Sequence, residues 1–137
     1  MITIAHAKPH EVDLAWEYCQ RFFADFKRFK YQNFQPEEIY LTLKEDRSAL
    51  FVAVEKNKIL GACVVSLEET KTGGRSLFVP IMGGVDFKRW YKTLADFVEK
   101  FAKENNCKTI EYIGRAGFSK LDNSYVEDGR IYVKEIK

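Results

Sequence analysis

The most constraining feature of the sequence is a long amphipathic segment with a strand-like run close to each end. Residues 86–105 carry Phe, Trp, Leu and Val at three- and four-residue spacing, which predicts a helix with one buried face. Residues 76–82 precede it and residues 109–113 follow it, and both runs are rich in strand-forming side chains. Together they span about 38 residues, long enough for a helical crossover between two parallel strands.

The other strands are expected to pair as hairpins. Residues 49–54 and 59–67 are strand-forming runs separated by four polar residues, 55–58, which predicts an antiparallel hairpin. Pro80 interrupts the run 76–82, so it is expected at a sheet edge or a bulge. Gly83 and Gly84 are expected to end that strand. A last hairpin is expected over residues 123–136.

The remaining elements complete one domain over residues 1–137. A short strand at residues 2–6 precedes Pro9, which opens a helix whose apolar stripe continues to Phe26. A second helix begins at Pro36 and ends near Asp46, and a short helix covers residues 118–121. The order predicts an α/β domain (an α+β mixed sheet), mostly antiparallel with one parallel, splayed strand pair and with helices on both faces.

Composition narrows the classes of function. Twenty-two Lys and Arg balance 20 Asp and Glu to a net charge of +2, so no overall field attracts nucleic acid or an anionic membrane. The 3 cysteines are an odd number, which argues against a disulfide framework. They and the 2 histidines lack the spacing of metal ligands, so no metal site is expected. No apolar run is long enough to cross a membrane, and residues 1–8 lack a signal-peptide pattern. A cytoplasmic protein is expected.

One aromatic and basic stretch, residues 21–34, is compatible with binding single-stranded nucleic acid. Its phenylalanines at 22, 23 and 26 continue the buried helix stripe, so they are unavailable for stacking on bases. The near-neutral charge also disfavours this function.

Three segments support a resemblance to a known family: Phe-Val-Ala-Val-Glu at 51–55, Ile-Leu-Gly at 59–61, and the helix end and strand at 101–110. With the order of the elements, they make the sequence resemble the GNAT acyltransferase superfamily over nearly the whole chain. The segments 114–118 and 130–136 are also similar to small GNAT-like proteins of tailed phages and prophages. The resemblance implies transfer of an acetyl or other acyl group from acyl-CoA to a small-molecule or peptide amine, without a metal.

The resemblance also implies a place for the cofactor. In the family, pantetheine inserts as a pseudo-strand where the strands before and after the long helix splay apart, and the pyrophosphate lies at the start of that helix. The residues expected near acetyl-CoA are Val79, Ile81 and Met82 at the thioester and Gly83, Gly84, Lys88 and Arg89 at the pyrophosphate.

The sequence departs from the family pattern at two places. The family's glycine-rich phosphate loop falls on residues 86–91, where Arg89 and Tyr91 occupy the two glycine positions. Gly83 and Gly84 then either bind the phosphates in place of that loop or only form the turn at the end of the strand. Lys88 and Arg89 likewise either contact phosphate or are ordinary surface residues.

The proton donor is the second departure. The family's tyrosine falls on Phe118, which leaves Tyr125 and Tyr112 as the available phenols, unless both are structural, and Glu111 as a possible base.

Two functions follow from this sequence. The first is an N-acyltransferase, in which Phe29, Tyr31 and Phe34 between the first two helices shape a substrate or partner pocket. The second is a catalytically inactive GNAT-fold phage protein that binds a host or virion protein, in the host cytoplasm or in the virion.

Overall fold

The fold is seen in a computed structural model that describes residues 1–23, 36–69 and 71–112. Its elements are β1 (Thr3–Ala7), the 3₁₀ helix η1 (Pro9–Glu11), α1 (Val12–Cys19), α2 (Pro36–Lys44), β2 (Ala49–Glu55), β3 (Lys58–Glu69), β4 (Arg75–Gly84), α3 (Phe87–Glu104) and β5 (Thr109–Tyr112). The expected last hairpin, the helix at 118–121 and Phe26 lie outside the described residues.

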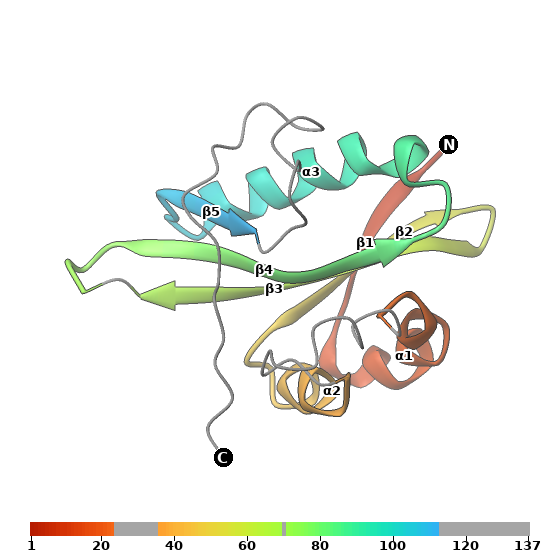
Figure 1. Cartoon of the computed structure of the whole chain (residues 1–137), viewed down its shortest axis with the longest axis horizontal. Helices are drawn as coiled ribbons and strands as arrows, with labels where there is room; N and C mark the ends of the chain where they lie inside the picture. Colours follow the sequence, from red (N-terminus) through yellow and green to blue (C-terminus); the bar gives the residue numbers. More distant parts are fainter. Residues whose placement is uncertain (24–35, 70, 113–137) are drawn as a thin grey trace, which may run out of the picture.

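The predicted fold class is confirmed. The strands form one sheet in the order β1-β2-β3-β4-β5, in which β4 and β5 are parallel and all other neighbours are antiparallel. Helices α1 and α2 cover one face and α3 covers the other (Figure 1). The β2–β3 hairpin turns at Lys56 and Asn57, both with positive φ, as a tight hairpin turn requires.

Each face of the sheet has its own apolar core. The α1/α2-side core includes Phe23, Leu43 and Ile81, and the α3-side core includes Trp90, Leu94 and other buried residues of the helix stripe. The stripe predicted for residues 86–105 is therefore confirmed, because α3 buries one residue per turn against the sheet.

The predicted end of β4 is wrong. The strand runs through Gly83 and Gly84, which pair with Ala62 and Gly61 of β3. A Cβ on Gly83 would lie 2.4 Å from the backbone oxygen of Phe22, after α1. The glycine therefore admits a close approach of the α1 segment to the strand, and it does not break the strand.

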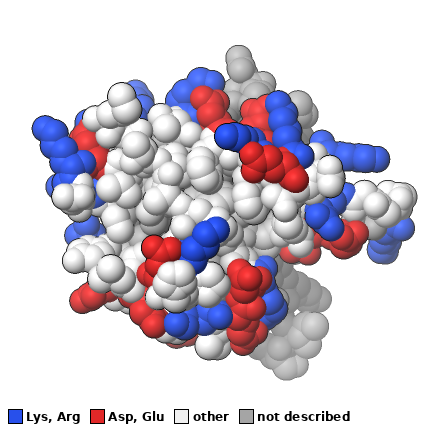
Figure 2. Space-filling view, turned by 180° about the vertical axis from the view of Figure 1, so that it is seen from behind, with Lys and Arg blue, Asp and Glu red and all other residues white. Residues whose placement is uncertain are grey.

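The surface of the described residues mixes both signs of charge. Figure 2 shows Lys and Arg beside Asp and Glu, around a broad uncharged area on the face seen from behind. No helix among the described residues is long and apolar enough to cross a membrane. The described part of the chain also brings together no group of three potential metal ligands.

Candidate functional site

Among the described residues, β5 pairs with only the first part of β4. The ladder runs from Ser76 opposite Thr109 to Val79 opposite Tyr112. Pro80 follows, and it has no N–H to continue the ladder. In Figure 1, β5 lies beside only the first half of β4. Among the described residues, the edge of β4 from Pro80 to Gly84 has no strand partner.

A β-bulge lies at the same point, as the position of Pro80 predicted. From Phe78 to Ile81, β4 advances three residues while its partner β3 advances two, from Ser66 to Val64. Regular alternation would place Val79 and Ile81 on one face. Instead Val79 belongs to the α3-side core and Ile81 to the α1/α2-side core. The extra residue therefore turns Val79 and Ile81 to opposite faces, and both side chains stay buried.

The three residues expected at the thioester are held by their side chains. Val79 and Ile81 are buried, and Met82 is half-buried against the α3-side core. The side chains of Val79 and Ile81 are committed to the cores, so these two residues can meet a ligand at the β4 edge only through their backbone. The expected contribution was backbone N–H groups, which this arrangement allows.

The start of α3 holds the two expected phosphate contacts, Lys88 and Arg89, both exposed. The Arg89 Nη2 atom lies 2.8 and 2.7 Å from the two carboxylate oxygens of Glu55 in β2. This guanidinium holds the pKa of Glu55 below its usual value. The Arg89 backbone N–H donates to the backbone carbonyl oxygen of Asp86 at 2.9 Å. Tyr91, in the other glycine position of the family pattern, packs on Phe87 with ring centroids 4.8 Å apart.

The candidate acid and base on β5 lie on opposite faces of the sheet. Tyr112 packs against the α3-side core. Glu111 is exposed and stands next to Phe78 in register, and Phe78 lines a pocket on the α2 face. Glu111 is therefore on the α2 face. Tyr125, Phe29, Tyr31, Phe34 and Phe118 lie outside the described residues.

That pocket, the α2 pocket, has a volume of about 250 Å³ and lies between α2 and the bulged part of β4. It is lined by Glu38, Ile39, Thr42, Arg47, Ser48, Val64, Ser66, Glu68, Phe78 and Pro80. Arg47 is paired with Glu45 at 2.7 Å, so the two lining glutamates, Glu38 and Glu68, give the pocket a negative character.

The hydroxyl groups that line the α2 pocket already donate hydrogen bonds within the protein. Thr42 Oγ1 donates to the Ile39 carbonyl at 2.7 Å, so Ser48 Oγ must donate to Thr42 Oγ1 across their 2.7 Å contact. Ser66 Oγ donates to Glu68 Oε1 at 3.2 Å. These three oxygens can therefore only accept further hydrogen bonds, which suits a ligand rich in donors.

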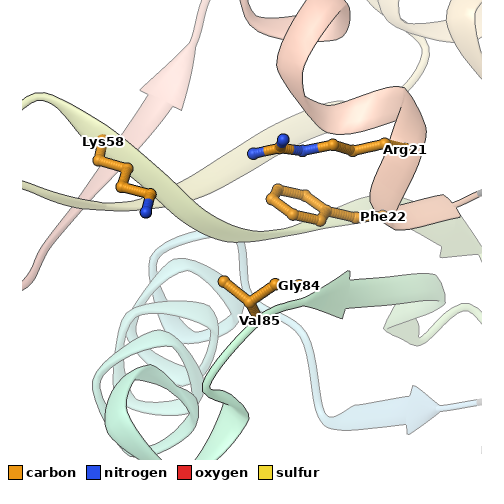
Figure 3. Close-up of a pocket in the computed structure, with 5 residues that line it drawn as sticks. All are labelled: Arg21, Phe22, Lys58, Gly84 and Val85. Atoms are coloured by element: carbon orange, nitrogen blue, oxygen red, sulfur yellow. The ribbon is translucent and has the colours of Figure 1, made fainter.

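A second hollow, the cationic pocket, lies at the end of β4 and has a volume of about 420 Å³. Arg21, Phe22, Lys58, Gly84 and Val85 line it (Figure 3). Of these, the sequence singled out only Gly84 as a cofactor residue. Arg21 and Lys58 carry no spacing signal, because they meet only when the segment after α1 packs against the sheet.

Comparisons with known proteins agree on the fold. No protein-family model and no curated protein matches the sequence. Among solved structures, an aminoglycoside acetyltransferase from an uncultured soil metagenomic sample, in complex with sisomicin, is similar with a TM-score of 0.73 and 16% identity, over 99% of this chain and 97% of that one.

Two bacterial structures are similar to the same degree. The ribosomal-protein-alanine N-acetyltransferase of Brucella melitensis has a TM-score of 0.71 and 15% identity, over 99% of this chain and 100% of that one. A GNAT family acetyltransferase of Staphylococcus aureus has a TM-score of 0.71 and 18% identity, over 98% of both chains. The chain therefore has the GNAT fold.

Proposed function

We propose that this protein is an acyl-CoA-dependent N-acyltransferase that acts on an amine. The observation that carries the proposal is the coincidence of three features of β4: among the described residues its last pair with β5 is at Val79, the bulge follows at Pro80, and the strand then runs to the start of α3. An extended ligand can add to such an edge as a strand does. The acetyltransferases that share the fold support the same reaction class.

Acetyl-CoA, the expected cofactor, would supply an acyl thioester for attack by the amine. The backbone of Val79, Ile81 and Met82 would hold the thioester end and orient its carbonyl. Gly83, Gly84 and Lys88 would hold the pyrophosphate end, where the N-terminus of α3 favours negative charge.

Arg89 can join the phosphate contacts only if its guanidinium leaves Glu55. The pair is accessible to solvent, with the two side chains 50% and 21% exposed. Exchange of one anionic partner for another is therefore inexpensive in free energy. The residues present at this edge fit the cofactor, with Lys88 as the cation that needs no rearrangement.

The acceptor amine would enter through the α2 pocket, across β4 from α3. Glu38 and Glu68 attract an ammonium group, and the serine and threonine oxygens accept its hydrogen bonds. Glu111, on the same face, is the proposed base that removes the proton from the amine. Tyr112 or Tyr125 is the proposed donor to the leaving thiolate.

Isothermal titration with acetyl-CoA tests the proposal, together with thermal unfolding. Acetyl-CoA at 100 times its dissociation constant should add about 2.7 kcal/mol to the free energy of unfolding. Glu55→Gln should tighten binding, because it frees Arg89, and Lys88→Gln should weaken it. Absence of any heat or thermal shift at millimolar acetyl-CoA would contradict the proposal.

A second candidate is a GNAT-fold protein without catalysis, a virion-associated or binding component of a phage. The side chains at the two glycine positions favour it: Arg89 is paired with Glu55, and Tyr91 is stacked on Phe87. It predicts that acetyl-CoA does not bind and that a host or virion protein does. For either function we propose a cytoplasmic protein, or a virion protein in the second case.

A further inference from the structure

The cationic pocket brings together two positive side chains from distant parts of the chain. Arg21 follows α1, and Lys58 is the first residue of β3. Figure 3 shows both side chains extending into the same space, above Gly84 and Val85. Two like charges that converge on one hollow repel each other unless an anion lies between them.

Neither cation has a counter-ion among the described residues. The ion pairs there involve Lys44, Arg47, Arg75, Arg89, Lys92, Lys100 and Lys103, but neither Arg21 nor Lys58. The nearest acidic residue to Lys58 along the β2–β3 hairpin, Glu55, is already bound by Arg89 at 2.7 Å. Glu17, one helical turn before Arg21, forms no ion pair with it.

The other walls of the pocket fix the position of one cation and add apolar surface. The Arg21 guanidinium carbon lies 5.1 Å from the centroid of the Phe22 ring, a cation–π contact that orients the charged group. Val85 is 47% exposed beside it. A volume of about 420 Å³ exceeds the size of a single phosphate. The pocket therefore has room for a phosphate group attached to a small organic molecule.

The pocket is on the side of β4 away from β5. Lys58 begins β3, and Gly84 pairs with Gly61 of that same strand. The edge proposed for acetyl-CoA is the opposite one, and of the residues named for the two sites only Gly84 borders both. We propose that the cationic pocket is a second site, which binds the phosphate group of a small phosphorylated molecule through Arg21 and Lys58. This proposal goes beyond acyl transfer and does not depend on it.

Isothermal titration with inorganic pyrophosphate tests the site, at ionic strength held constant with NaCl. The wild-type protein should bind pyrophosphate, and Arg21→Gln and Lys58→Gln should each weaken binding by at least about tenfold, since each removes a charge-assisted contact. Lys56→Gln is the matched control, because it removes one positive charge from the same hairpin without altering the pocket. Its affinity should stay within about twofold of wild type.

Three results would overturn the proposal: no binding by the wild type, equal weakening by Lys56→Gln, or retained binding in both pocket variants while circular dichroism shows them folded. A second titration places the site. Acetyl-CoA affinity should be the same in Arg21→Gln and Lys58→Gln as in the wild type, whereas weaker acetyl-CoA binding in either variant would make the pocket part of the cofactor site and refute a second site. Pyrophosphate binding without acetyl-CoA binding would uphold this proposal while refuting acyl transfer.

Discussion

At the scale of single residues, Trp90 explains why position 61 is a glycine, and it adds to the backbone crowding at Gly84. Its side chain is fully buried, and its Nε1 donates to the Val85 carbonyl at 2.6 Å. A Cβ on Gly61 would lie 2.4 Å from Trp90 Cζ2, and one on Gly84 would lie 2.9 Å from the same atom. The indole therefore lies flat against the backbone of β3 and β4, at the point where α3 begins.

Gly61→Ala should destabilise the protein by about 1–3 kcal/mol, because the added methyl group collides with a side chain that cannot move aside. Urea unfolding measures the change. In the Trp90→Phe background the same substitution should cost clearly less, since the six-membered ring of the indole that it meets is gone. Equal costs in the two backgrounds would show that this contact is not the cause.

At the scale of elements, Arg89 Nη2 donates to both carboxylate oxygens of Glu55 and ties the first turn of α3 to the β2–β3 hairpin. Because Arg89 lowers the pKa of Glu55, the stability that the pair adds is present above the unfolded pKa, about 4.5. It is lost as the pH falls through the lower pKa of the folded state.

Arg89→Gln should raise the pKa of Glu55 toward its usual value, as measured by NMR titration of its carboxyl carbon. The stability difference between this variant and wild type should be present at pH 7 and should vanish in acid. Lys92→Gln, which breaks the exposed Lys92–Asp96 pair within α3, should leave the pKa of Glu55 unchanged. A Glu55 pKa that does not respond to Arg89→Gln would contradict the pairing.

Elements with strong periodicity could be predicted from the sequence, and contacts between distant segments could not. The α3 stripe, the β2–β3 hairpin and the bulge at Pro80 each have a local signal that the fold retains. The end of β4 was missed because Gly83 serves a long-range contact with Phe22, although Gly-Gly usually marks a turn. For the same reason the sequence did not bring Arg21 and Lys58 together, nor did it show that Glu55 binds Arg89.

At the scale of the whole molecule, one sheet separates two apolar cores, and the reactivity of the three cysteines can measure how tightly each core is packed. Cys19 lies in the α1/α2-side core, and burial raises the pKa of its thiol to about 12. Cys63 is fully buried in the α3-side core, and burial raises its pKa as well. Cys107, after α3, is only partly buried.

A thiol-specific reagent at neutral pH should therefore label Cys107 first and should leave Cys19 and Cys63 unmodified in the native protein. All three should react in denaturant. Mass spectrometry of the labelled peptides identifies each site. Rapid native labelling of Cys63 would mean that the α3-side core opens far more readily than its packing implies.

The bulge in β4 also changes which face of the sheet two consecutive residues occupy. Pro80 and Ile81 are consecutive, yet both lie on the face of the sheet that α1 and α2 cover. If Pro80 were deleted, Val79 and Ile81 would alternate regularly, and each would keep its present core. The additional residue, Pro80, is itself buried on that face and lines the α2 pocket, so the bulge gives this pocket a wall that regular alternation would not provide.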